Sequence, residues 1–356
     1  MTRSLEHPLI TFAIFAYNQE RFIAEAVQGA LGQTYSPLEI ILSDDCSSDN
    51  TYTIIQETIA NYDGAHRVIA RRNERNLGLG QHVNVVMELA KGELTVAAAG
   101  DDISLPHRTE RLWQEYVAAE RNAYSLFSNE YLIDENGTSR ALGRQRPPNS
   151  ERLTLNWFIN HQASVTGSSQ AWRRDVFDLF GPLNEHVVSE DVVIPFRALL
   201  LGSIRYIHEP LVLRRYTGDN LSMGSFNRWN PNITTRDFCD REIRHARNFE
   251  AVYRTWQMDI EKFKKIQPKQ QHELDSMVSV IEHKLSRVQS EVRFWQASNS
   301  VKSKLLFQDF VCKGFRSTAA RLFLSWIFPQ VFLRWRHIIS TNQREALLDT
   351  QSTRLK

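Results

Sequence analysis

Strand-like and helix-like patterns alternate along the first hundred residues, and this alternation limits the possible folds more than any other feature. Short apolar runs typical of buried strands are separated by segments whose apolar residues recur at helical spacing. The predicted strands cover residues 9–17, 38–45, 66–74 and 93–102, and the predicted helices cover 21–33, 49–62 and 79–92. Strands that alternate with helices predict an α/β fold with a Rossmann-like, mainly parallel sheet and helices on both faces.

The pattern becomes more mixed after residue 102. Apolar residues at helical spacing predict further helices at 106–121 and 190–202. Gly92 is predicted to follow the end of the third helix, because glycine is common at that position. Pro210 is predicted to divide residues 203–216 into two strands.

The composition changes after about residue 223. Residues 236–296 are rich in Arg, Lys, Glu and Gln with apolar positions at helical spacing, and they predict two long helices that part near Gln267-Pro268. We therefore predict an α/β domain at 1–223, followed by a helical C-terminal region at 224–356. The long helices could also pair with a second copy of the chain, so a homo-oligomer remains open.

Charge and cysteine content narrow the class of protein. The 43 Lys and Arg residues against 41 Asp and Glu residues give a formal charge of +2, which offers no reason to expect nucleic-acid binding. Cys46, Cys239 and Cys312 lie far apart without metal-ligand spacing, which favours a reducing cytoplasm. The N-terminus lacks the long apolar region of a signal peptide, and no apolar run is long enough to span a bilayer.

Polar residues follow three of the predicted strands: Tyr17-Asn18, Asp44-Asp45 and Asp101-Asp102. Open parallel sheets bind ligands at the carboxyl ends of their strands. Any one of these pairs could equally be a helix cap or a turn. Three such clusters at one edge of a sheet favour a binding site.

Acids in these places suit a nucleotide diphosphate. A divalent cation held by carboxylates can neutralise the charge that grows on a leaving diphosphate, so Asp101 and Asp102 are candidate ligands of Mg²⁺ or Mn²⁺. The carboxylate of Asp45 could instead accept the ring N–H of a pyrimidine base.

Five segments in the same order resemble family 2 glycosyltransferases, which are inverting enzymes with the GT-A fold. The segments are 11–51, 76–108, 167–185, 189–202 and 211–222. The resemblance implies that Asp101 binds the metal with Asp102 beside it, and that Asp191 is the general base with Glu190 in support. It implies donor-binding roles for Ala13, Tyr17, Asn18, Asp45, Asn76, Gly78 and Arg215.

Three positions depart from the pattern of the family. Ala99 stands where the first acid of an Asp-x-Asp metal motif is usual, which predicts reduced metal affinity. Thr217 stands where a histidine often contacts the leaving group, and Cys46 where glycine is common.

The resemblance implies transfer of a sugar, with inversion, from a nucleotide-diphosphate sugar to a hydroxyl of a saccharide or lipid-linked acceptor, in surface polysaccharide or glycolipid assembly. From the residues alone, Glu190 and Asp191 could simply cap a helix. The alternative is a non-catalytic sugar-nucleotide-binding or scaffold protein, in which the missing acid at Ala99 reflects loss of catalytic function. A nucleotidyltransferase or a Rossmann dehydrogenase is disfavoured, because residues 13–22 contain no glycine-rich phosphate loop.

Residues 301–337 combine bulky apolar side chains with seven Lys and Arg residues and a single acid. This composition suits a helix that lies in anionic lipid headgroups, and it predicts a cytoplasmic protein at the inner face of the plasma membrane. An amphipathic helix that packs its apolar side on the rest of the protein would have a similar pattern.

Overall fold

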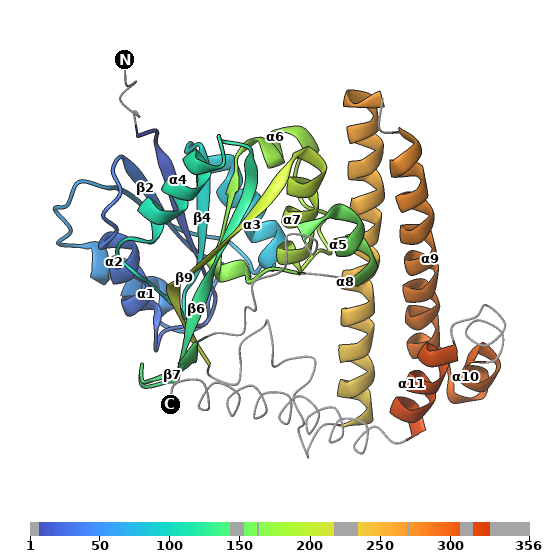
Figure 1. The fold of residues 1–356 in the computed structure, drawn as a ribbon. Coiled ribbons are helices and arrows are strands. Elements are labelled where there is room, and N and C mark those ends of the chain that lie inside the picture. Colours follow the sequence, from blue (N-terminus) through green and yellow to red (C-terminus); the bar gives the residue numbers. More distant parts are fainter. Residues whose placement is uncertain are drawn as a thin grey trace, which may run out of the picture. The chain divides into compact units, whose positions relative to one another are not determined.

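The computed structural model (Figure 1) describes residues 7–142, 153–161, 164–216, 234–268, 271–306 and 316–327. Its central feature is a nine-stranded mixed sheet with the order β3-β2-β1-β4-β8-β6-β9-β5, in which β7 pairs with β6. The strands are β1 (Ile10–Ala16), β2 (Leu38–Asp44), β3 (Arg67–Arg72), β4 (Leu94–Ala99), β5 (Ile103–Ser104), β6 (Ala123–Ile133), β7 (Ser139–Leu142), β8 (Gln170–Arg173) and β9 (Ser203–Arg215).

The sheet is mainly parallel where the sequence predicted it to be. Strand β1 pairs in parallel with β2 and β4, and β2 pairs in parallel with β3. Strand β6 pairs in parallel with β9, whereas β5, β7 and β8 run antiparallel to their partners. The predicted α/β fold is therefore confirmed.

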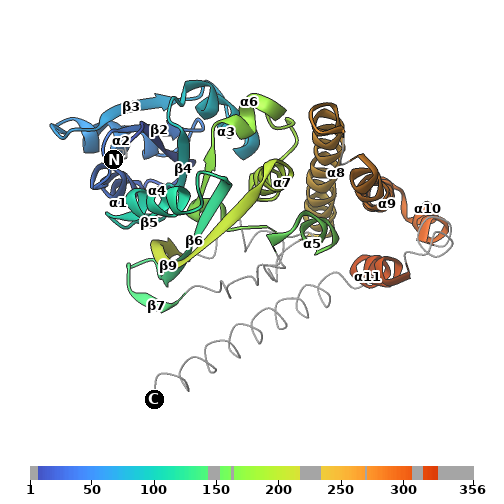
Figure 2. The same cartoon turned by 45° about the horizontal axis from the view of Figure 1, so that its top comes forward.

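Helices cover both faces of the sheet (Figure 2). On one face, α1 (Ile23–Leu31), α2 (Thr51–Ile59) and α4 (Arg108–Ala118) share a core with Ile10, Phe12 and Ile14 of β1. On the other face lie α3 (Leu79–Leu89) and α7 (Glu190–Leu201), accompanied by α5 (Leu155–His161) and α6 (Asp175–Phe180). This two-sided burial explains why the strands are nearly continuous apolar runs rather than alternating ones.

Gly92 and Pro210 have different roles from those predicted. Helix α3 ends at Leu89, and a Cβ on Gly92 would lie 2.2 Å from the backbone nitrogen of Thr11, so glycine is required by a close crossing of two backbones. Pro210 lies inside the single strand β9. It pairs with Asn129 of β6 beside an irregularity in the register, where a missing N–H is tolerated.

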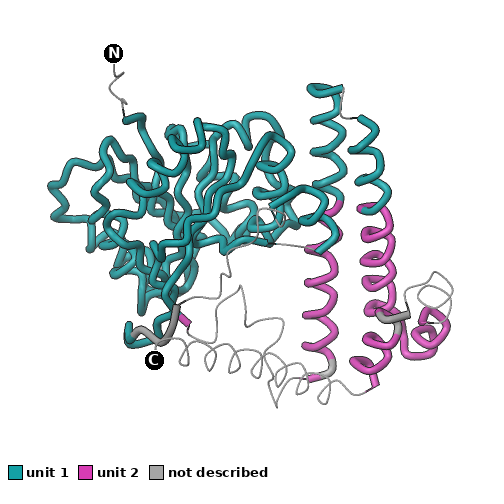
Figure 3. The backbone as a smooth tube through the Cα atoms, in the orientation of Figure 1, with its two compact units in different colours: residues 1–215, 254–280 teal, residues 216–253, 281–356 magenta. Residues whose placement is uncertain are grey.

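The chain divides into two compact units (Figure 3): residues 1–215 with 254–280, and residues 216–253 with 281–356. The predicted boundary between residues 223 and 224 lies outside the described residues. The two long helices predicted around Gln267-Pro268 are confirmed as α8 (Thr235–Ile266) and α9 (Gln271–Gln296), and each contributes to both units.

The second unit has a small core of its own. It is built by parts of α8 and α9 with α10 (Asn299–Leu305) and α11 (Arg316–Ile327), around Phe238, Phe294, Trp295, Leu306 and Leu322. Within this unit, Arg321 forms ion pairs with Glu242 and Glu291. In the part of the chain that is described, no helix is both long enough and apolar enough to cross a bilayer.

Candidate active site

Three adjacent parallel strands end at the same edge of the sheet, so their polar end residues lie near one another. The ends of β2 and β4 are about 10 Å apart, because β1 lies between them and neighbouring strands are spaced by about 4.8 Å. The Asp45 N–H donates to the Ala16 carbonyl (2.9 Å), and the Gly100 N–H donates to the Phe15 carbonyl (3.1 Å). The predicted residues at this edge are Tyr17, Asn18, Asp45, Asp101 and Asp102.

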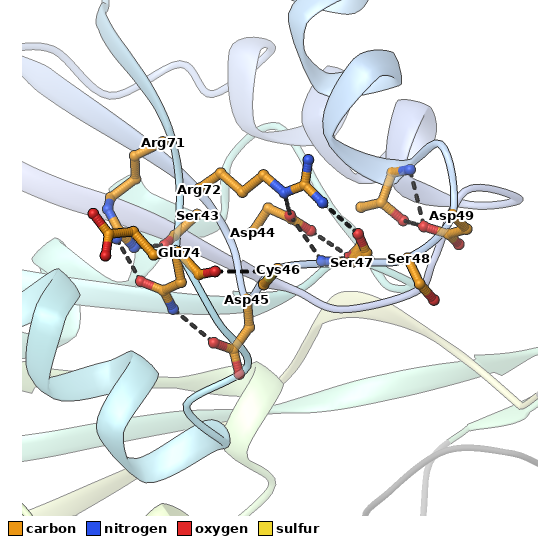
Figure 4. Close-up of polar contacts among 12 residues, drawn as sticks. Ser43, Asp44, Asp45, Cys46, Ser47, Ser48, Asp49, Arg71, Arg72 and Glu74 are labelled. Carbon is orange, nitrogen blue, oxygen red and sulfur yellow. Dashed lines mark hydrogen bonds and ion pairs between the residues drawn. The ribbon is translucent and has the colours of Figure 1, made fainter.

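Asp44 and Asp45 are neighbours but point to different partners (Figure 4). The Asp44 carboxylate accepts hydrogen bonds from the Ser47 N–H (3.0 Å) and the Ser47 hydroxyl, and it forms an ion pair with Arg72 (3.2 Å). Asp44 therefore stabilises the turn after β2 and does not face a ligand.

The carboxylate of Asp45 fixes the segment that leads into α3. It accepts hydrogen bonds from the Asn73 side chain (2.6 Å) and from the N–H groups of Leu77 and Gly78 (both 2.9 Å). Asp45 is only 3% exposed. A carboxylate has about four acceptor positions, so these three contacts leave room for one further donor such as a base N–H.

The other predicted donor-binding residues divide into two groups. Tyr17 is exposed, and the Asn18 side chain accepts the Ser48 N–H (2.8 Å) at a positive φ of 51°. Asn76 accepts the Gly78 N–H (3.1 Å), and the φ of +76° at Gly78 favours glycine. Ala13, in contrast, is fully buried in the middle of β1 and does not reach this edge, so we leave it out of the site.

His82 of α3 is a buried residue near Asp45 that the sequence analysis did not select. Its Nε2 lies 2.6 Å from the Ser43 hydroxyl, and burial lowers the pKa of His82 to about 4. The imidazole is therefore neutral at physiological pH. The sequence signal was a polar residue on the apolar side of a helix.

Asp101 and Asp102 differ in their accessibility. Asp102 is buried and accepts the backbone N–H of Arg215 (2.8 Å). Burial raises the pKa of Asp102, while a hydrogen bond from Ser168 and the charge of Arg214 oppose this rise. Asp101 is partly exposed, so it is the more accessible carboxylate of the pair.

Arg215, which was predicted to reach the diphosphate, is directed into the protein instead. Its side chain is 1% exposed and forms an ion pair with Glu25 (3.0 Å). The guanidinium also donates to the backbone carbonyls of Asp101, Asp134 and Glu135, each at 3.1 Å. Arg215 thus anchors the turn after β4 and is not placed to receive a ligand.

Arg214 has the opposite orientation, because successive side chains of a strand point to opposite faces. It forms an ion pair with Glu130 of β6 (2.9 Å), and both side chains are largely buried. The charge of Arg214 also acts on Asp102 and Asp191. Neither Arg214 nor Glu130 was selected from the sequence, although an acid within the strand β6 was a usable signal.

Glu190 and Asp191 form the first turn of α7, as predicted for that helix. Burial raises the pKa of Asp191 to about 7, against the opposing effects of a backbone hydrogen bond and the Arg214 charge. Burial and the charge of Asp191 raise the pKa of Glu190 well above its ordinary value. Gly167 makes room for this pair, because a Cβ there would lie 2.5 Å from Glu190 Oε1.

The acidic residues suit a metal ion that is shared with a substrate. Among the described residues, no group of three or more His, Cys, Asp and Glu side chains could hold a metal ion by itself. Mg²⁺-type cations are commonly held by one or two carboxylates together with substrate phosphates. Asp101, with Ala99 two residues before it, fits such a shared site and does not form a complete protein cage.

These features define the class of protein as a GT-A-type transferase domain: a mainly parallel sheet with acids at adjacent strand ends and a carboxyl pair at the start of α7. Residues 11–180 match the model of Glycosyl transferase family 2. The chain therefore belongs to this family through that part of its sequence. The match ends before Glu190, so the placement of the carboxyl pair comes from the structure.

Individual relatives agree with this membership. The chain is 32% identical over 139 residues to an uncharacterized glycosyltransferase of Methanocaldococcus jannaschii, covering 38% of this chain and 47% of the relative. It is 27% identical over 217 residues to a chondroitin synthase of Escherichia coli, covering 61% and 30%. The chain thus spans less than half the length of both relatives.

A solved structure supports the fold. S. aureus TarS 1–349, crystallised with UDP-GlcNAc, matches with a TM-score of 0.51 at 16% identity, covering 90% of this chain and 92% of that one.

Proposed function

We propose that this chain transfers a sugar from a nucleotide-diphosphate sugar to an acceptor hydroxyl with inversion, as a metal-dependent hexosyltransferase. The observation that carries the proposal is Asp191, a packed carboxyl with a pKa of about 7 at the start of α7. A base that operates near neutral pH needs a pKa close to that value. Asp101 and Asp45 lie at an edge of the same domain where a nucleotide diphosphate would be expected to bind.

The proposed step is a single displacement. The acceptor oxygen forms a bond to the anomeric carbon while Asp191 takes the hydroxyl proton, and the bond from that carbon to the phosphate oxygen breaks with its electron pair leaving on the diphosphate. Glu190 supports the base as the neighbouring carboxyl, whose own pKa is raised by burial and by the charge of Asp191. One displacement at the anomeric carbon inverts its configuration.

A divalent cation would supply charge neutralisation to the leaving diphosphate. Asp101 would hold this cation, and Asp102 would stabilise the turn after β4 by accepting the Arg215 N–H. Asp45 would receive the base, and Tyr17 and Asn18 would border the nucleotide.

The test of the proposal is a donor screen. UDP- and GDP-sugars are incubated with the full chain, and release of nucleoside diphosphate is measured with Mn²⁺, with Mg²⁺ and with a chelator. Metal-dependent release from at least one donor is expected. A chain that binds donors but never releases the diphosphate would be the non-catalytic binding protein instead.

The metal is expected to bind tightly only together with the diphosphate, because Asp101 offers few protein ligands. Calorimetric titration of Mn²⁺ should give weak binding to the free chain and markedly tighter binding in the presence of UDP. Asp101→Asn should remove most of this gain, whereas Asp63→Asn, at an exposed acid between α2 and β3, should leave it unchanged. Equal Mn²⁺ affinity with and without UDP would contradict the shared site.

The acceptor is proposed to be a saccharide or a lipid-linked saccharide in surface polysaccharide or glycolipid assembly. Support comes from the similarity to a polysaccharide synthase, the chondroitin synthase of E. coli.

We further propose that the chain assembles as a homo-oligomer through the long helices, and that it divides at residue 223 into a catalytic domain and a helical C-terminal region.

We also propose contact with an anionic membrane through 301–337. In the described part of this segment, α11 packs Leu322 inward while Phe323, Leu324 and Ile327 are exposed at 47%, 49% and 43%. Spacings of one, three and four residues place these three on one face of the helix. The excess of Lys and Arg in 301–337 would complement negative headgroups, at the inner face of the plasma membrane.

Replacement of Phe323 and Leu324 by serine should reduce co-flotation with vesicles that contain phosphatidylglycerol by at least tenfold, because each buried CH₂ contributes about 0.8 kcal/mol and two such groups already exceed the roughly 1.4 kcal/mol of a tenfold change. The matched control is Leu179→Ser, at an exposed leucine of α6. A wild-type chain that never floats with these vesicles would refute the membrane contact.

A further inference from the structure

We propose that Glu130 is a positioning residue that fixes Arg214 beside the reacting groups, and that Arg214 is the cation that receives the leaving diphosphate. This inference rests on the proposed function. It assigns the cationic role to the neighbour of the arginine that the family resemblance implied, and it adds an acid to which the resemblance gave no role.

The first argument is the different environment of the two arginines. The Arg215 guanidinium uses its donors on Glu25 and three backbone carbonyls, and it stacks over the Phe22 ring at 4.6 Å. Release of these contacts would break the ion pair with Glu25 and three hydrogen bonds to carbonyl oxygens, and the guanidinium, which is 1% exposed, would lose these partners. Arg215 is therefore held in place by the fold itself.

The second argument is the charge around Arg214. Its guanidinium forms an ion pair with Glu130 at 2.9 Å. The backbone N–H of the next residue, Arg215, donates to Asp102 (2.8 Å), so Arg214 lies beside the turn that carries Asp101. The positive charge of Arg214 also acts on Asp101, Asp102 and Asp191. These residues are the predicted metal ligand, its buried neighbour and the predicted base. A cation beside the predicted metal ligand is suited to stabilise the charge of a departing diphosphate.

The third argument is the burial of Glu130. Glu130 is 2% exposed, and burial raises its pKa, with Arg214 as the main opposing influence. A packed carboxylate in a strand of the central sheet has little freedom to move, so it restricts Arg214 to one orientation. Fixed donors aimed at developing charge stabilise a transition state more than mobile ones do.

The two assignments have separate chemical consequences. Arg214 stabilises the negative charge on the departing phosphate oxygens, and it also favours the ionised form of Asp191. Glu130 touches no substrate. It acts only through the orientation of Arg214, so a variant that keeps an acceptor oxygen at this position should keep most of the activity.

The experiment compares Arg214→Ala, Arg214→Lys, Glu130→Ala and Glu130→Gln in the full chain. Arg214→Ala should lower kcat by about 10²–10³-fold, the loss typical of one oxyanion-stabilising group. The low-pH side of the kcat–pH profile of this variant (the acid limb), where Asp191 is protonated, should move to higher pH, because Asp191 loses a positive neighbour. Arg214→Lys should retain the position of the acid limb while kcat stays reduced, because a lysine supplies the charge without the planar fork.

Glu130→Ala should lower kcat by up to about 10²-fold through misorientation of Arg214, and Glu130→Gln should recover most of it. Arg205→Ala is the matched control, because Arg205 is an exposed arginine on the same strand. Its kcat, donor KM and acid limb should all equal those of the wild type.

Binding of UDP with Mn²⁺, measured by calorimetry, gives a readout that does not depend on turnover. Arg214→Ala should weaken UDP binding about tenfold or more, and Arg205→Ala should not. Unchanged kcat and UDP affinity in Arg214→Ala would overturn the role of Arg214, and equal losses in Glu130→Gln and Glu130→Ala would overturn the positioning role. A wild type that binds UDP but turns over no donor would defeat the proposed function and leave the arginine comparison valid.

Discussion

Asp191→Asn should lower kcat by about 10³-fold while donor binding stays close to that of the wild type. The amide has the shape of the carboxylate and can still accept hydrogen bonds at the start of α7, but it cannot take the acceptor proton. Release of nucleoside diphosphate gives kcat, and calorimetry gives the donor affinity. Near-normal turnover in this variant would remove the assignment of Asp191 as the base.

The pH profile provides the control for that result. Because the pKa of Asp191 is raised to about 7, a growing fraction of the base is protonated and inactive below that pH. Wild-type kcat should therefore rise with pH through about 7, and the residual activity of Asp191→Asn should lack this limb. Glu185→Gln, at an exposed acid shortly before α7, should keep both the limb and the rate.

Asp259→Ala should lower the free energy of unfolding by about 3–5 kcal/mol, because it leaves a buried charge without its partner. Arg197 of α7 and Asp259 of α8 form an ion pair at 2.8 Å with side chains that are 1% and 2% exposed. Arg197 also donates to the Gly181 carbonyl (2.7 Å), so it cannot turn away to solvent without losing a second contact. Denaturant unfolding measures the loss.

Glu261→Ala is the matched comparison on the same helix. Glu261 forms an ion pair with Lys264 at 2.6 Å, but its side chain is 60% exposed, and exposed pairs contribute about 0–1 kcal/mol. A similar small change in both variants would show that the Arg197–Asp259 pair does not stabilise the fold.

The periodicity of the sequence was sufficient to predict the strands and helices of the first hundred residues, because β1, β2 and β4 are buried on both faces and each helix on one. It failed where a distant segment decides the conformation. Gly92 is required by the backbone of Thr11, and the ladder between β6 and β9 accommodates Pro210. Neither constraint is visible within a short window of sequence.

The candidate site was predictable in part for similar reasons. The strand-end acids could be found because parallel strands end at one edge, and the structure places Asp45 and Asp101 there. The choice between Arg214 and Arg215 depended on which face of β9 each side chain occupies, and two adjacent arginines give no alternation from which to decide. Ala13 failed as a site residue because its strand continues for three more residues before the edge.

The residues that fold with the candidate site are not contiguous in the sequence. Residues 254–280, which include parts of α8 and α9, belong to the same compact unit as the sheet. Asp259 of this segment forms the buried ion pair with Arg197 of α7, the helix that carries Glu190 and Asp191. A shortened chain that stops near residue 223 would keep every predicted site residue yet expose the surface that α8 covers. Expression of the sheet portion alone should therefore yield an insoluble or poorly folded product, and efforts to crystallise it with a donor should begin from chains that extend at least to residue 280.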